Sequence, residues 1–194
     1  MISTKQIKQY LETLAEQYPN IVITRLEKGS NVQKSMGLTY EIDDPNIDKK
    51  LGDFPEGVVP YGQIHRKLRN SQGEILGLYN DSKRIPFSRA YNKSIGECLE
   101  KAILVQLSAQ RGRDAFLING CLAEDGEVGV GSHAYNVVFK DGNPFLVDAQ
   151  NPLAKDSEGN ITHPYIAPIQ SIDREYGDLI VPQEWKLGRI YSIS

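Results

Sequence analysis

A β-hairpin centred on Asp141-Gly142 is the strongest structural signal in this sequence. Two β-rich runs, 133–139 and 144–149, flank the turn. An Asp-Gly pair between two such runs strongly favours a tight hairpin turn. A two-residue turn places Phe139 opposite Pro144, so we expect two neighbouring strands of an antiparallel sheet whose register is set by the turn.

The register of this hairpin predicts which of its side chains share a face. Side chains alternate along a strand, so positions two apart point the same way. The side chains expected on one face are those of His133, Tyr135, Asp148 and Gln150. Asp148 is then the diagonal neighbour of His133, within reach of an imidazole–carboxylate contact. The opposite face is apolar as well, which indicates that the hairpin lies inside the sheet.

A helix is predicted upstream of the hairpin. Ser94-Ile-Gly-Glu97 has the pattern of a capping box, and apolar residues at helical spacing between 95 and 107 mark one broad face that lasts until Arg111-Gly112. Cys98 lies near the start of this helix, where unpaired N–H groups and the helix dipole lower the pKa of a thiol. We expect the helix to pack into the core.

The exact start of this helix decides what the Cys98 backbone can do. If Ser94 is the cap, the N–H of Cys98 is tied to the Ser94 carbonyl. A start nearer Gly96 leaves that N–H free to bind an oxyanion, and we favour the later start.

Cys98, His133 and Asp148 together have the parts of a cysteine nucleophile site. The thiolate attacks a carbonyl carbon, His133 takes the thiol proton, and Asp148 holds the imidazole in one tautomer. The competing interpretation is that Cys98 is a core residue, since free cysteines are among the most buried residues. Three matching residues on compatible elements favour the site. For Cys121, in the middle of an apolar strand, the core interpretation is favoured.

The rest of the chain supplies further elements. A capping box at Ser3–Gln6 opens a helix that ends at Pro19, and residues 43–61 form a long surface loop of the kind that often carries recognition. The further strands expected are 21–26, 38–42, 115–122, 178–181 and 188–193. We predict an α+β fold, a mainly antiparallel sheet with the Cys98 helix packed against it and the first helix on an outer surface. The prediction is a single domain over 1–194, with an N-terminal helix and variable region at 1–90 and, at 91–194, a core made of the Cys98 helix and the sheet that carries His133 and Asp148.

Composition excludes several classes of function. A net charge of −3 argues against a general nucleic-acid binder, and we expect the basic run 65–69, which includes His65, on a solvated face. The sequence holds no bilayer-length apolar run and no apolar block at its start, so we expect no membrane span, no signal peptide and a cytoplasmic protein as synthesised. A zinc site from Cys98, Cys121, His133 and His163 lacks finger-like spacing, so we expect neither a metal nor another cofactor.

Three segments carry a resemblance to a known family. Gly96-x-Cys98 opens the helix, 132–137 reads Ser-His-Ala-Tyr-Asn-Val, and 145–150 reads Phe-Leu-Val-Asp-Ala-Gln. In this order they resemble the transglutaminase-like branch of the papain-like cysteine enzymes, over residues 91–152. The resemblance implies a papain-like core, with Cys98 as nucleophile, His133 as general base and acid, and Asp148 as the residue that orients it. It also implies acyl transfer through a thioester.

The resemblance leaves the substrate and the oxyanion donor open. A protein or peptide partner is expected, with a protein glutamine side chain as first choice, as in a transglutaminase or glutamine deamidase. A cysteine protease, an N-acetyltransferase and a catalytically silent protein-binding module are the alternatives. Glu97 stands where the family often has an aromatic residue. The candidate oxyanion or substrate contacts are Asn80, Tyr91, Asn92, Tyr135 and Gln150. Compact enzymes of this type also occur among bacterial effectors that modify host proteins, so secretion as an effector stays open.

Overall fold

The chain forms a mixed α and β structure dominated by one antiparallel sheet. The computed structural model describes residues 3–35, 37–122, 131–155, 157, 161–173, 178–180 and 190–191. The helices are α1 (Thr4–Gln17), η1 (Ile47–Leu51, 3-10), α2 (Tyr61–Lys67), α3 (Gln72–Gly77), α4 (Phe87–Lys93) and α5 (Cys98–Ala109). The strands are β1 (Val22–Ile23), β2 (Asn31–Ser35), β3 (Leu38–Glu41), β4 (Arg84–Pro86), β5 (Ala115–Leu122), β6 (Gly131–Lys140), β7 (Asn143–Lys155), β8 (Ile161–Pro168), β9 (Ser171–Asp173), β10 (Asp178–Ile180) and β11 (Ile190–Tyr191).

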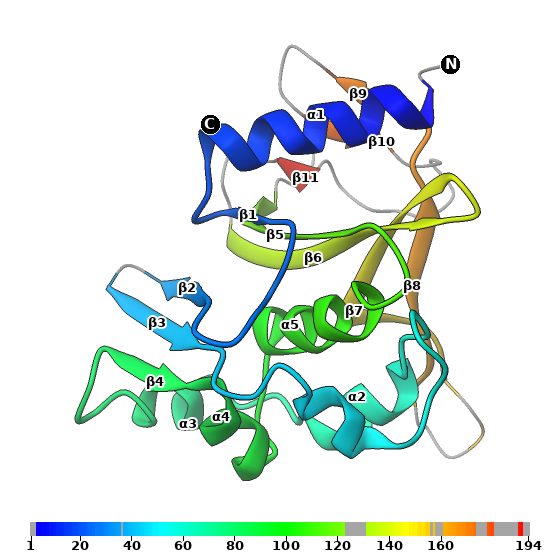
Figure 1. Ribbon diagram of the computed structural model, residues 1–194. Helices are drawn as coiled ribbons and strands as arrows, with labels where there is room; N and C mark the ends of the chain where they lie inside the picture. The colour runs from blue at the N-terminus through cyan, green and yellow to red at the C-terminus, as the bar shows by residue number, and fades with distance from the viewer. Residues whose placement is uncertain are drawn as a thin grey trace.

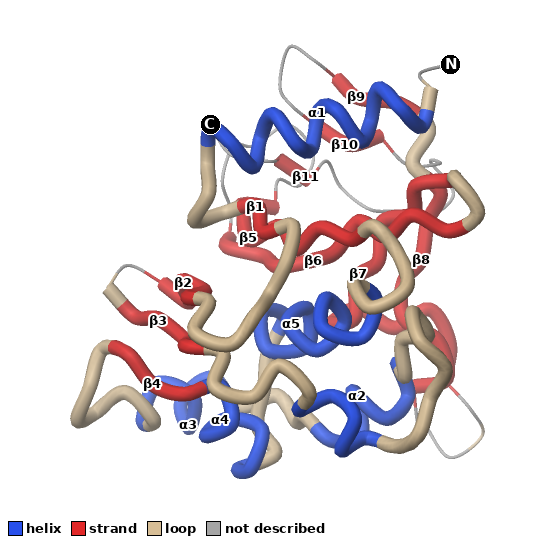
Figure 2. The backbone as a smooth tube through the Cα atoms, in the orientation of Figure 1, coloured by secondary structure: helices blue, strands red, loops and turns tan. Residues whose placement is uncertain are grey.

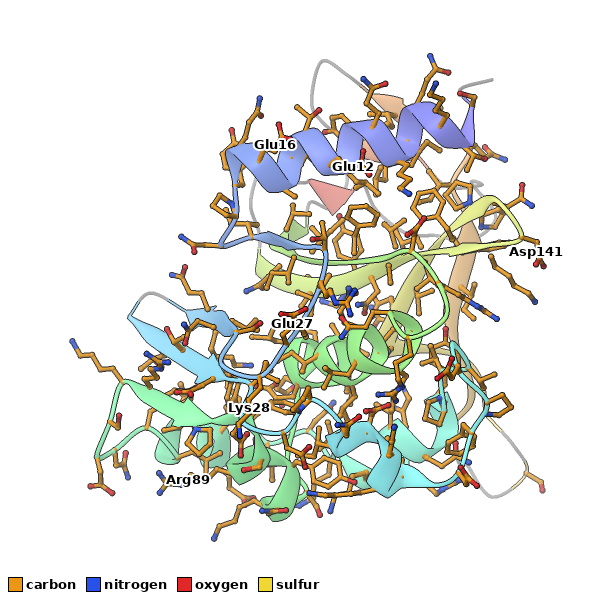
Figure 3. The ribbon with its side chains drawn as sticks, in the orientation of Figure 1. Glu12, Glu16, Glu27, Lys28, Arg89 and Asp141 are labelled. Atoms are coloured by element: carbon orange, nitrogen blue, oxygen red, sulfur yellow. The ribbon has the colours of Figure 1, made fainter. Side chains whose placement is uncertain are left out.

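The predicted hairpin is present and lies inside the main sheet. The strand order is β8-β7-β6-β5-β11-β10-β9, and β1 also pairs with β5. Phe139 faces Pro144 across β6 and β7, as the two-residue turn requires. Asp141 and Gly142 both have positive φ, 51° and 77°, which is the backbone of a type I′ turn. Asp141 lies at the tip of the hairpin (Figure 3).

The main sheet separates two hydrophobic clusters, with α1 on one face and α5 on the other (Figure 1). Alternate residues of β6 divide between them: Tyr135 and Val137 pack with the α1 side, whereas Ala134 and Val138 pack with the α5 side. The predicted capping box at the start of α1 is also present, with Gln6 N–H 3.3 Å from the Ser3 hydroxyl. The period of two along β6 thus builds a core on both faces.

Helix α5 is buried all round, which differs from the single apolar face that its sequence predicts. Every residue from 99 to 109 is buried. The reason is that elements from the first 95 residues cover the side of α5 that faces away from the sheet (Figure 2). They contribute Ile47 of η1, Ile64 of α2, Ile75 of α3 and Phe87 of α4 to the same core cluster. A small sheet, in the order β2-β3-β4, lies beside them.

Several local predictions need correction. The expected strand at 21–26 is only the two residues of β1, and the expected surface loop at 43–61 contains η1, in which Ile47 and Asp48 are buried. The basic run at 65–69 is not a fully solvated face, because it includes Leu68, which is 1% exposed. Parts of the strands expected at 178–181 and 188–193 lie outside the described residues, and β10 and β11 are the parts that are described. Within the described ranges, no helix is long and apolar enough to cross a bilayer.

Candidate active site

Cys98 is the first residue of α5, so the later of the two predicted starts is correct. The N-cap is Glu97, and Glu97 and Glu100 cap each other, with the Glu97 N–H 2.8 Å from Oε2 of Glu100. The capping box predicted at Ser94 is wrong, because Ser94 has φ of 59° and ends α4. The N–H of a first helical residue has no partner within its helix. The Cys98 N–H is therefore placed to bind the oxyanion of a carbonyl group that the Cys98 sulfur attacks.

Close packing against the end of α2 explains where α5 begins. The Arg69 N–H donates to the Ser94 carbonyl at 3.1 Å, and the Gly96 N–H donates to the Arg69 carbonyl at 2.9 Å. A Cβ on Gly96 would lie 2.8 Å from Cβ of Glu100 and 2.9 Å from Cδ1 of Leu68. The chain needs glycine here because a larger residue would push the start of α5 away from α2.

His133 and Asp148 meet where β7 separates from β6. The last paired residues of the two strands are Asn136 and Val147, whereas β6 stays paired with β5 as far as Gly131. Nε2 of His133 lies 2.6 Å from Oδ2 of Asp148. Both side chains are almost fully buried, at 11% and 0% exposure. The predicted contact between the imidazole and the carboxylate is thus present.

The Asp148 carboxylate is held by three further donors. Oδ1 accepts the backbone N–H of Gln150 at 3.0 Å and that of Asn151 at 3.3 Å. Oδ2 accepts the Asn151 side-chain amide at 2.7 Å. Asn151 was not among the predicted site residues, although Asp148-Ala-Gln-Asn151 before a proline is a turn-forming sequence that could have indicated it. These bonds fix the orientation of the carboxylate behind the imidazole.

The thiol and the imidazole are arranged to share one proton. Burial alone would raise the pKa of Cys98, but hydrogen bonds from His133 and the Ala134 N–H, together with the charges of His133 and Lys34, lower it. Burial opposes protonation of His133, yet its hydrogen bonds with Asp148 and Cys98 raise its pKa to about 10. Since Nε2 faces Asp148, Nδ1 is the nitrogen left for the sulfur. A thiolate–imidazolium pair is the expected resting state.

The surroundings of Cys98 and His133 determine how exposed the cysteine is and how the imidazole ring is held. Cys98 is partly exposed at the start of α5, where it packs against the edge of the core. The Tyr135 ring is nearly parallel to the His133 ring, with centroids 6.4 Å apart and 18° between the planes. Tyr135 is fully buried. It therefore supports the imidazole and offers no exposed surface to a substrate.

Of the other four residues that were predicted to contact the oxyanion or the substrate, one lies at the site and three do not. Gln150 joins it, since its backbone N–H bonds to Asp148 and its side chain lies near Glu97, 3.5 Å from Nε2 to Oε2. Tyr91 is buried in the core below Lys67, whose Nζ lies 4.4 Å from the ring centroid. Asn80 and Asn92 are exposed. No contact places these last three against the triad within the described part of the chain, and the Cys98 N–H is the better oxyanion donor.

Two lysines near the site were missed by sequence reasoning. Lys101 is 3% exposed, and its Nζ lies 2.6 Å from Oε1 of Gln150. Lys34 of β2 lies 3.0 Å from Oε1 of the buried Glu100 and contributes positive charge near Cys98. A lysine within an apolar helical run is the only signal that could have indicated Lys101. Lys34 comes from a distant strand and leaves no signal near Cys98.

His65 is partly buried and does not lie on a solvated face as predicted. Its Nε2 is buried with no hydrogen-bond partner among the described residues, although the ring bonds to the backbone of Ala149. Burial, followed by the charge of Lys101, lowers the pKa of His65 to about 4. A neutral imidazole thus packs against the strand that carries Asp148.

Neither a metal site among the described residues nor a known relative indicates what this site does. No group of three or more potential metal ligands occurs among the described residues, and the side chains of Cys121 and His163 lie outside them. No family model matches the chain, and neither a curated protein nor a solved structure matches it. The chemistry of the site must therefore be judged from its geometry, which combines a lowered-pKa thiol, a buried imidazole and a fixed carboxylate at a helix N-terminus.

Proposed function

We propose that this protein is a cysteine enzyme that transfers acyl groups through a thioester on Cys98. The observation that carries the proposal is the buried His133–Asp148 pair, 2.6 Å apart, beside a cysteine at the first residue of a helix, where the imidazole lowers the pKa of the Cys98 thiol. The same arrangement supports the finer assignment of the fold to the papain-like and transglutaminase-like class. A purely structural cysteine would need neither the imidazole nor the carboxylate.

The proposed reaction has two half-reactions. The Cys98 thiolate attacks a carbonyl carbon, and the Cys98 N–H stabilises the oxyanion. The His133 imidazolium then gives its proton to the departing amine, which leaves a thioester. In the second half, neutral His133 takes a proton from water or an amine as it attacks the thioester, and the thiolate is released. Asp148 keeps the ring aligned in both halves.

A glutamine side chain of a protein is the first-choice acyl donor. Its attack by Cys98 releases ammonia, and water or an amine then completes deamidation or transamidation. The resemblance to transglutaminase-like enzymes favours this donor over a peptide bond or an acetyl group. The partial exposure of Cys98 is compatible with a donor presented on the surface of a partner protein.

Covalent adduct formation tests the proposal. The wild type, Cys98→Ser and Cys121→Ser proteins should be incubated with glutamine peptides, peptide substrates and thioester donors, and their intact masses measured. We expect an acyl adduct on the wild type and on Cys121→Ser, ammonia release with glutamine donors, and neither with Cys98→Ser. A Cys98 thiol that forms no adduct with any donor, and reacts with iodoacetamide no faster than a buried thiol, would instead support the catalytically silent protein-binding module.

A further inference from the structure

The backbone that carries Asp148 lies at the end of its strand ladders. Pairing with β6 ends at Val147, and Asp148 still pairs with residue 165 of β8, but the register with β8 shifts between Asp148 and Pro152. An orienting carboxylate must stay within a fraction of an ångström of its productive position. Beyond Asp148, contacts other than the regular ladder must therefore add to the rigidity of this segment.

A side-chain bridge joins this segment to α5. Lys101 donates from Nζ to Oε1 of Gln150 and to Oδ1 of Asn70, both at 2.6 Å. Gln150 in turn gives its backbone N–H to Oδ1 of Asp148 at 3.0 Å. Lys101 lies three residues after Cys98, so both side chains leave the same region of one helix. The bridge thus links the helix of the nucleophile to the strand segment of the carboxylate.

The chemistry of Lys101 is unusual for a purely structural residue. Its side chain is almost fully buried, yet its two nearest partners are neutral amide oxygens. Burial lowers the pKa of Lys101, while the charges of Glu97, Cys98, Glu100 and Asp148 oppose that effect. On the α2 side it faces neutral His65. A buried cation without a direct ion pair is costly, and a thiolate at Cys98 offsets part of that cost.

We propose that Lys101 is a positioning residue for the Cys98 site, which through Gln150 ties the segment carrying Asp148 to the helix carrying Cys98. Lys101 does not touch the reacting atoms. It keeps carboxylate, imidazole and sulfur aligned, and its positive charge favours the thiolate over the thiol. The role of Lys101 in catalysis rests on the proposed function, but its effect on the Cys98 thiol can be measured without any substrate.

Thiol alkylation across pH is the experiment. The rate of Cys98 modification by iodoacetamide should be measured from pH 4 to 10 for the wild type, Lys101→Met, Gln150→Leu and the control Lys8→Met. Lys8 undergoes the same chemical change on α1, where its side chain is 40% exposed and paired with Asp114. We expect Lys101→Met to move the midpoint of the alkylation profile up by about one pH unit, which slows alkylation about tenfold at pH values below the wild-type midpoint. Gln150→Leu should change the rate in the same direction, and Lys8→Met should match the wild type.

The outcomes separate this inference from the proposed function. Alkylation needs no acyl donor, so a wild type that reacts rapidly at pH 6 but turns over no donor would contradict the proposed function alone. Where a donor is found, the Lys101→Met protein should lose kcat with KM nearly unchanged. If Lys101→Met fails to fold, Gln150→Leu decides the matter, because it keeps the lysine. Wild-type alkylation profiles in the folded variants would overturn the positioning role.

Discussion

At the scale of single residues, the reactivity of Cys98 depends on how well His133 holds a proton. The pKa of His133 is raised to about 10 by Asp148 and Cys98 against the opposing effect of burial. The ring is therefore charged across the neutral range and gives up its proton as the pH rises through about 10. Together with the lowered pKa of Cys98, this predicts a broad pH window for activity, bounded at low pH by protonation of the thiolate and at high pH by loss of the imidazolium proton.

The variant Asp148→Asn should narrow this window from its alkaline side. Without the negative carboxylate the imidazolium is less stable, so the pKa of His133 falls and the upper limb of kcat/KM moves to lower pH. We expect a loss of about 10² in kcat/KM at neutral pH. The measurements are the pH profile of acyl transfer and the NMR titration of the His133 ring. Asp141→Asn, at the exposed hairpin tip, is the matched control. An unmoved His133 titration in Asp148→Asn would contradict this account.

At the scale of elements, the position of Cys98 depends on a contact between α5 and the end of α2. Gly96 makes this contact possible, because a Cβ there would collide with Glu100 and Leu68 at less than 3 Å. The backbone bonds of Gly96 and Arg69 hold the same junction. The first turn of α5, and with it the thiol and the Cys98 N–H, is thus placed by an element some thirty residues earlier in the chain.

Gly96→Ala should destabilise the protein and disturb the site together. Overpacking of this kind costs about 1–3 kcal/mol, so the midpoint of urea unfolding should fall. The alkylation rate of Cys98 at pH 6 should fall as well, since the start of α5 moves relative to His133. Gly73→Ala in α3 is the control, because no atom lies within 4 Å of its added Cβ and its φ is not positive. Equal stability of the two variants would contradict the close packing at Gly96.

At the scale of the whole molecule, the sheet separates a layer formed by α1 from the layer that contains α5 and Cys98. Helix α1 packs on one face of the sheet, whereas α5, with η1, α2, α3 and α4 around it, lies on the other face (Figure 1). The triad lies at the N-terminal end of α5, at the place where β6 and β7 separate. Because Cys98 belongs to the α5 layer, stability contributed by α1 should be separable from the reactivity of the thiol, although Tyr135 links the two layers by packing on the α1 side beside the His133 ring.

Leu11→Ala tests this separation. Leu11 is fully buried against the outer face, so its truncation should lower the free energy of unfolding by about 2–5 kcal/mol. Under native conditions the folded variant should keep the wild-type alkylation rate of Cys98. The control is Glu12→Ala, an exposed neighbour on the same helix (Figure 3), which should change stability by no more than about 0.5 kcal/mol. A folded Leu11→Ala protein with an unreactive Cys98 would show that the two layers are coupled.

Local chemistry explains the features that could be predicted from the sequence. The turn at Asp141-Gly142 sets the register of β6 and β7, and that register places His133 and Asp148 on one face. The capping box of α1 is likewise made by residues three apart in the chain. Turn type, strand alternation and capping depend on neighbours in sequence, so these features leave readable patterns, and the contact between His133 and Asp148 follows from them.

Contacts between residues far apart in the sequence decided the features that the sequence did not predict. The first residue of α5 is Cys98 and not a residue nearer Ser94 because the segment 94–96 is bonded to Arg69 and pressed against Leu68. The burial of His65 and the bridge from Lys101 to Gln150 arise from elements that meet only when the chain folds. The sequence by itself determined the three groups of the candidate site and the hairpin that pairs two of them. Only the tertiary structure decided how the sulfur is presented to the imidazole, because that depends on side chains packed together across dozens of intervening residues.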